Sequence, residues 1–263
     1  MVSEMLKYQN ADGGFGNGFE SDTLALESGA TASAEAVSMV QDYGLDPSLA
    51  WVKMLLGYFE KTRQNTPSFW ESVPKSIEDY PHPPWWSYKP DTDFTPNPCA
   101  VIASGLIRYG SDAQKELGRE VAGKCIGFLN SDAFCWDHST YCLQRLYITL
   151  RDTGSSLIDK KANESMKRRI NANVCHDESK WSDYVAQPLD LAESPDSPWY
   201  PIVKEGIESN IDYWINNLSD EGYWPLHFSW GEAGMPKEVA QNWQGYFAVN
   251  RVRILKAFDA IDI

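Results

Sequence analysis

Residues 8–22 read Tyr-Gln-Asn-Ala-Asp-Gly-Gly-Phe-Gly-Asn-Gly-Phe-Glu-Ser-Asp, and this stretch decides the fold. The apolar residues just before it predict a short helix that ends near Asn10. Asn10, Asp12 and the two glycines that follow are turn residues, because they favour conformations through which a helix does not continue. Phe15 then supplies one large aromatic side chain. The pattern therefore predicts a helix end, a polar turn and an aromatic anchor.

The same pattern recurs four more times in weaker form. Each later copy has an apolar helix end, a polar turn and one tryptophan, namely Trp70, Trp136, Trp181 or Trp224. The anchors are roughly 45 to 65 residues apart, about the length of two helices and two loops. This spacing predicts a repeat of helix pairs. We expect Trp70, Trp136 and Trp181 to pack in the core between the pairs.

One copy of the pattern resembles a known repeat. Gln9 to Gly16, read as Gln-x-x-Asp-Gly-Gly-Phe-Gly, resembles the glutamine-tryptophan repeat of the terpenoid cyclase and protein prenyltransferase superfamily. Asp220 to Trp224 is similar to a second copy that lacks the glutamine. The resemblance implies an all-α fold, a single α/α toroid of about five helix pairs with no significant sheet. It further implies acid-initiated chemistry on an isoprenoid.

Apolar side chains at helical spacing predict helices along the rest of the chain. The expected ranges are 29–44, 46–59, 98–110, 111–129, 138–149, 155–173, 181–191, 202–218 and 239–258. Residues 66–98 interrupt this pattern with several prolines and two adjacent tryptophans. Such a long loop in a compact domain is usually functional or disordered, and its aromatic residues argue against disorder. We interpret residues 1–263 as one toroid domain.

Composition restricts the class of protein. A hydrophobic content of 43% and an aromatic content of 13% exclude a disordered chain. The formal charge of -14 argues against a nucleic-acid partner, because phosphate binding needs clustered Lys and Arg. No apolar run predicts an integral membrane segment or an export signal, so we expect a soluble, cytoplasmic protein. The sequence indicates neither a metal site nor a particular cofactor or oligomeric state.

The candidate catalytic residues lie on loops that, in a toroid, lead into inner helices and line the mouth of the central cavity. Converging carboxylates in a partly apolar cavity push one another's pKa values apart, so that one can donate a proton near neutral pH. Asp91-Thr92-Asp93 is similar to the Asp-x-Asp-Asp motif of terpenoid cyclases, with Phe94 in place of the last acid. For each acid alone, a helix cap or a solvated side chain is the alternative. The candidates are Glu20, Asp22, Asp91, Asp93, Asp183 and His138.

The candidate substrate-binding residues are mostly aromatic. Indole faces stabilise a carbocation or stack on the apolar face of a sugar, and core packing is the alternative for each of them. The candidates are Trp85, Trp86, Tyr184, Trp199, His227 and Trp230.

Three functions remain open at this point. In the first, Asp93 or Asp91 protonates an isoprenoid, and Trp85 and Trp86 stabilise the resulting cation. In the second, a carbohydrate-active hydrolase or lyase uses paired carboxylates, with Asp22, Asp93 and Asp183 as the first acids to test. In the third, a non-catalytic toroid binds a small molecule or a peptide. For either enzyme, we expect an isoprenoid or a sugar as the ligand in the central cavity.

Overall fold

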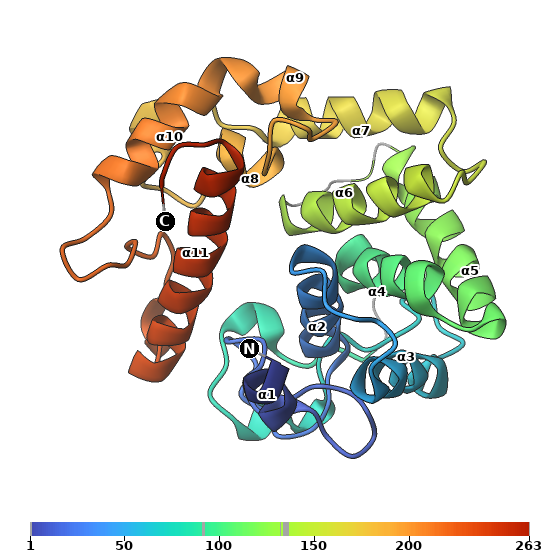
Figure 1. The fold of residues 1–263 in the computed structure, drawn as a ribbon. Helices are drawn as coiled ribbons and strands as arrows, with labels where there is room; N and C mark the ends of the chain where they lie inside the picture. The colour runs from blue at the N-terminus through green and yellow to red at the C-terminus, as the bar shows by residue number, and fades with distance from the viewer. Residues whose placement is uncertain (1, 91–92, 132, 134–136, 263) are drawn as a thin grey trace. The chain divides into compact units, whose positions relative to one another are not determined.

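The computed structural model describes residues 2–90, 93–131, 133 and 137–262 (Figure 1). Over these residues the chain contains helices, turns and a few isolated bridges, such as that between Gln9 and Phe15, and no strand. This confirms the predicted all-α class. The α-helices are α1 Val2–Met5, α2 Ala30–Asp42, α3 Ala50–Thr62, α4 Pro96–Tyr109, α5 Asp112–Leu129, α6 Asp137–Asp152, α7 Lys160–Asn173, α8 Pro188–Leu191, α9 Tyr200–Val203, α10 Ile207–Asn216 and α11 Lys237–Ala257.

Short 3-10 helices lie between the α-helices. They are η1 Leu6–Tyr8, η2 Lys75–Asp79, η3 Pro84–Trp86, η4 Glu178–Lys180, η5 Lys204–Gly206 and η6 Gly231–Ala233. In the described part of the chain, none of the helices is both long and apolar enough to cross a membrane.

The chain divides into two compact units, which we describe separately. Unit 1 is Met1–Asn163 and unit 2 is Glu164–Ile263, so the boundary falls within α7. The predicted single toroid domain stays a prediction, because it concerns how the helices of both units are arranged together.

Unit 1 is built around α4, which packs against α2, α5 and α6. Ile102 and Leu106 of α4 are fully buried. A small residue allows α2 to approach closely, since a Cβ on Gly105 would lie 2.6 Å from Cγ1 of Val37. The capping box at Ser111, whose hydroxyl accepts a hydrogen bond from the backbone of Gln114, starts α5 at the predicted place.

The turn at residues 9–16 ties the N-terminal segment to α3. The side-chain amide of Gln9 donates to the carbonyl oxygens of Gly13 and Trp51, each at 2.9 Å. The carboxylate of Asp12 accepts from the backbone N–H of Gly14 at 3.0 Å and from the hydroxyl of Ser28 at 2.8 Å. Gly13 lies so close to α3 that a Cβ there would meet the Met54 carbonyl oxygen at 2.3 Å.

The aromatic anchors share one structural role. The indole N–H of Trp70 donates to the carbonyl of Phe59, that of Trp181 to Cys175 and that of Trp224 to Trp214, at 2.9, 2.8 and 2.6 Å. Each acceptor lies near the end of the preceding helix, where backbone carbonyls lack helical partners. Trp70 is 3% exposed and Trp181 is fully buried, which confirms their predicted core packing. Trp136 lies outside the described residues.

Two predicted helices of unit 2 are α-helical over only part of their ranges. Only Pro188–Leu191 of the range 181–191 is α-helical, because the side chain of Gln187 takes hydrogen bonds that would compete with a helix. Its amide donates to the Trp181 carbonyl at 2.9 Å, and its oxygen accepts from Asn210 and from Trp214, each at 2.7 Å. The range 202–218 is interrupted by η5 at Gly206, where a Cβ would lie 2.8 Å from Cγ of Pro188.

Candidate functional site

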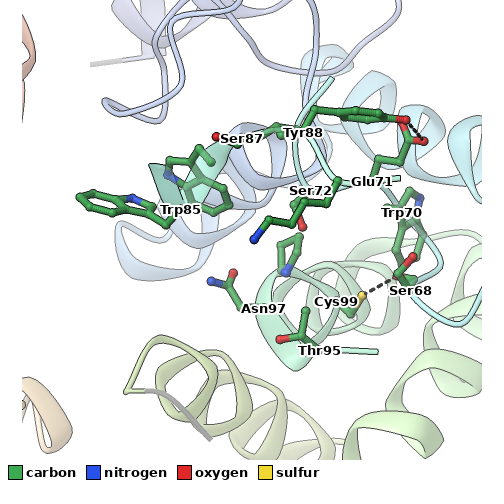
Figure 2. Close-up of a pocket in the computed structure, with 14 residues that line it drawn as sticks. Ser68, Trp70, Glu71, Ser72, Trp85, Ser87, Tyr88, Thr95, Asn97 and Cys99 are labelled. Carbon is green, nitrogen blue, oxygen red and sulfur yellow. Dashed lines mark hydrogen bonds between the residues drawn. The ribbon is translucent and has the colours of Figure 1, made fainter. Parts of the chain in front are cut away.

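The long segment predicted at residues 66–98 forms nearly all of the lining of a pocket in unit 1 (Figure 2). The pocket has a volume of about 170 Å³ and combines aromatic rings with hydroxyl, amide and charged groups. It is lined by Ser68, Trp70, Glu71, Ser72, Val73, Trp85, Trp86, Ser87, Tyr88, Lys89, Thr95, Asn97, Pro98 and Cys99.

The two adjacent tryptophans occupy different positions in this pocket. Trp85 is 49% exposed, and Figure 2 shows it on the opposite side of the pocket from Trp70. Trp86 is half-buried and packs against a small core that contains Val73 and Ile77. Because prolines start the helical turn η3, the backbone that carries both indoles has restricted freedom. Trp85 is therefore the ring that is available to a ligand.

Hydrogen bonds hold several polar groups of the pocket. The hydroxyl of Tyr88 donates to the Glu71 carboxylate at 2.9 Å, and the thiol of Cys99 donates to the Ser68 carbonyl at 3.0 Å (Figure 2). Burial raises the pKa of the Cys99 thiol to about 12, so the thiol stays protonated and is a poor nucleophile.

Buried carboxyl groups lie in the turn that follows the first anchor. Glu20 is 7% exposed and Asp22 is 3% exposed. One oxygen of Glu20, Oε2, has no hydrogen-bond partner among the described residues. Burial is the main cause that raises the pKa of Glu20 well above its usual value, and the charges of Asp22 and Glu35 add to it. Burial and the neighbouring acids thus favour the protonated form of Glu20.

Glu35 of α2 belongs to the same group of acids, and the sequence reasoning missed it. Burial raises its pKa from 4.5 to about 7; Arg145 opposes this shift and Asp42 adds to it. Arg145 is itself engaged with both carboxylate oxygens of Asp42, at 2.7 and 2.8 Å. A signal was present in the sequence, since Glu35 is a single acid between Ala34 and Ala36.

His138 stands at the start of α6 beside these acids. Its side chain reaches solvent, but the surrounding protein partly desolvates the imidazole and so lowers its pKa. The charge of Asp22 only partly opposes this shift. His138 is therefore mainly neutral at pH 7 and able to accept a proton. Of the predicted catalytic residues, the structure thus brings together Glu20, Asp22 and His138, and adds Glu35.

Glu20, Asp22 and Glu35 do not line the pocket themselves, but three contacts join it to the segments that carry these acids. The backbone N–H of Thr31, one turn before Glu35 on α2, donates to the carbonyl of Ser72 at 3.0 Å. The hydroxyls of Thr95 and Ser139 lie 3.4 Å apart, which holds the end of the loop against the first turn of α6. Ala25 packs in the same small core as Val73, Ile77 and the partly buried Trp86 and Tyr88.

The remaining predicted residues lie elsewhere. Asp91 is outside the described residues. Asp93 is exposed and does not line the pocket. Its neighbour Phe94 lies 6.3 Å from the ring of Phe69 and 6.2 Å from that of Phe128, so this position serves packing where the cyclase motif has an acid.

Two of the aromatic candidates in unit 2 are packed rather than open to a ligand. Trp199 and Trp230 are only 3% and 2% exposed, so their rings are packed within the unit. Asp183 is exposed, and Tyr184, 58% exposed, has its ring 5.8 Å from that of Phe228. His227 is half-buried. Within the described residues, no group of three or more His, Cys, Asp and Glu side chains could hold a metal ion.

Comparisons with protein-family models, with curated proteins and with solved structures give no match.

The raised pKa of Glu35 predicts a pH-dependent stability. Unfolded glutamate loses its proton near pH 4.5, whereas folded Glu35 keeps it to about pH 7. Between these two pH values the folded state therefore binds more protons than the unfolded state. The contribution of Glu35 to the free energy of unfolding is fully present below pH 4.5 and is lost as the pH rises through 7. The loss is at most about 3 kcal/mol. Urea unfolding at about pH 5 and about pH 8 measures it.

Glu35→Gln cannot ionise, so it is expected to reduce the fall in the free energy of unfolding between these two pH values. The same fall in both proteins would contradict a raised pKa for Glu35.

Proposed function

We propose that unit 1 is the catalytic part of a carbohydrate-active enzyme that cleaves a glycosidic bond by acid–base catalysis. The observation that supports this most is the pKa of Glu35, about 7, within a group of acids that includes Asp22. A glycosidase needs a carboxylic acid that keeps its proton near neutral pH and a second carboxylate that is ionised.

Exposure suggests how the roles are divided. Glu35 is only half-buried, whereas Glu20 is almost completely buried, so Glu35 is the acid that a substrate can approach. The pKa of Glu35, about 7, suits a group that donates a proton to the leaving-group oxygen. Asp22, whose charge adds to the raised pKa of Glu20 and partly opposes the lowered pKa of His138, is the proposed base or nucleophile. The raised pKa of Glu20 favours its protonated form, which limits the negative charge of the group.

The pocket supports a sugar as the ligand. Its volume of about 170 Å³ is close to that of a cavity that holds one six-membered ring. The exposed face of Trp85 can stack on the apolar face of a sugar ring. Ser72, Asn97 and Glu71 provide hydrogen-bonding groups for hydroxyls.

The second candidate function is acid-initiated chemistry on an isoprenoid. It is supported by the resemblance of the turn from Gln9 to Gly16, in which Gln9 bonds to the start of α3. A raised pKa argues for the sugar, because it makes a carboxylic acid weaker and protonating an alkene requires a stronger acid than protonating a departing oxygen. A thermal-shift screen of the whole protein against oligosaccharides and isoprenoid alcohols distinguishes the two substrates.

Trp85→Ala is expected to weaken binding of a sugar that stabilises the protein by about fivefold to tenfold, because one stacking face is lost. Isothermal titration calorimetry measures the change. Tyr184→Ala, which removes an exposed aromatic ring from unit 2, is the matched control and is expected to leave the affinity unchanged. Equal affinities for the wild-type protein and Trp85→Ala would contradict a sugar site at Trp85.

A further inference from the structure

A buried arginine of unit 2 lies among aromatic rings. Arg251 of α11 is 6% exposed. Its guanidinium carbon lies 4.7 Å from the ring centroid of Trp214, 5.5 Å from that of Trp224 and 5.7 Å from that of Phe247. We call these three rings the aromatic box. The box holds the cation through the faces of the rings.

The aromatic box leaves one requirement of Arg251 unmet. A guanidinium has N–H donors in its own plane, and these need acceptor atoms rather than ring faces. Nε of Arg251 is buried and has no hydrogen-bond partner, and the described residues provide no ion pair for this side chain. The carboxylate of Asp190 attracts the cation but already accepts a hydrogen bond from the backbone of Gln187 at 2.8 Å. The missing partner is an acceptor in the plane of the guanidinium.

Two further polar side chains lie within the field of Arg251. Burial lowers the pKa of His227 and raises that of Tyr213, and the charge of Arg251 acts to lower both pKa values. One ring nitrogen of His227 donates to the backbone of Ser182, while the other, Nε2, is buried and has no hydrogen-bond partner among the described residues. Two unpaired polar atoms, Nε of Arg251 and Nε2 of His227, therefore occur in the same region of unit 2.

We propose that unit 2 binds a carboxylate monoanion with an apolar or aromatic body, through Arg251 beside the aromatic box. A carboxylate is planar and accepts two parallel hydrogen bonds from an arginine. One guanidinium balances one negative charge, and the chain's formal charge of -14 disfavours a more highly charged anion. His227 would add a hydrogen bond to the carboxylate when protonated. This site is independent of the chemistry proposed for unit 1.

The test follows the Nε–H resonance of Arg251 by NMR in the whole protein labelled with ¹⁵N-arginine. The Arg251→Lys variant, which lacks this resonance, assigns it. We expect benzoate to shift it saturably at millimolar concentrations, whereas chloride at equal ionic strength does not. An N-acetylated peptide with a free C-terminal carboxylate is the second probe. Tighter binding of the peptide would identify a peptide terminus as the source of the carboxylate, and tighter binding of benzoate would identify a free acid.

Two results would overturn the proposal. If neither benzoate nor the peptide shifts the resonance, Arg251 is held by the aromatic box alone. If inorganic phosphate binds more tightly than both, the site does not select a carboxylate. Both results are measured on the wild-type protein.

Variants then locate the contact. Arg251→Lys keeps the charge but loses the planar pair of donors, so the affinity for benzoate, followed through the other resonances, is expected to fall about tenfold. Arg253→Lys, which makes the same substitution, is the matched control, because Arg253 lies two residues further along α11 and is paired with Glu193 at 2.6 Å. An equal loss in both variants would show that the loss does not depend on the guanidinium of Arg251 itself, and would contradict the site.

Discussion

Replacing Glu35 by glutamine is expected to slow cleavage of an alkyl glycoside by about 10²- to 10⁴-fold while the protein stays folded. The physical reason is the loss of a proton donor whose pKa, about 7, suits transfer to a leaving oxygen near neutral pH. Glutamine has a similar shape but carries no acidic proton. The measurement is the initial rate at saturating substrate, with the substrate taken from the screen against oligosaccharides.

Cleavage rates on substrates with different leaving groups distinguish a proton-donor role of Glu35 from any other role. A nitrophenyl group departs as a stable anion and needs little protonation, so Glu35→Gln is expected to slow its release far less. Asp22→Asn should slow both substrates, because the base or nucleophile acts whatever the leaving group. Glu116→Gln, at an exposed glutamate of α5, is the control for the chemistry of the substitution. Equal losses on both substrates in Glu35→Gln would contradict its role as the acid.

Replacing Gly13 by alanine is expected to lower the free energy of unfolding by about 2–4 kcal/mol. Two effects combine at this position. The backbone φ of Gly13 is +95°, which disfavours any residue with a Cβ, and that Cβ would lie 2.3 Å from the backbone oxygen of Met54. Relieving the contact would move the turn away from α3, although Gln9 holds both together. Urea unfolding of the variant and the wild-type protein measures the loss.

Two other glycines provide controls for the Gly13 prediction. Gly44 also has a positive φ, +57°, but a Cβ there would meet no atom within 4 Å. Gly44→Ala is therefore expected to lower the free energy of unfolding by only about 1–2 kcal/mol, because it adds backbone strain without a close contact. Gly57 lies within α3 with no atom within 4 Å, so Gly57→Ala should stabilise the helix by up to about 1 kcal/mol. A loss at Gly13 no larger than that at Gly44 would contradict the role of the close contact.

Much of the helical structure could be predicted because it depends on local patterns. Ser111 with Gln114 is a capping box that starts α5, and the apolar spacing of 239–258 corresponds closely to α11. The prediction for 181–191 failed because the conformation of this range depends on hydrogen bonds to residues far away in the sequence. Gln187 contacts Asn210 and Trp214, which are more than twenty positions away, and nothing in the range 181–191 reveals that.

The candidate site was predicted only in part for a related reason. Glu20 and Asp22 were identified because they lie on a loop, and His138 because it precedes a helix. Glu35 was missed because it lies within a helix, where an acid usually faces solvent. Its raised pKa results from burial, which depends on how α2 packs in unit 1. Asp93 was favoured by a motif, but the loop leaves it exposed and uses the adjacent Phe94 for packing.

The sequence by itself determined the all-α class, the turn at residues 9–16 and the tryptophan anchors. These features depend on glycine conformation, helix capping and apolar spacing, which act over a few neighbouring residues. Only the tertiary structure decided which acids are buried together and which aromatic rings remain open to a ligand. Those properties depend on desolvation and on charges carried by segments far apart in the chain, such as Asp22 and His138.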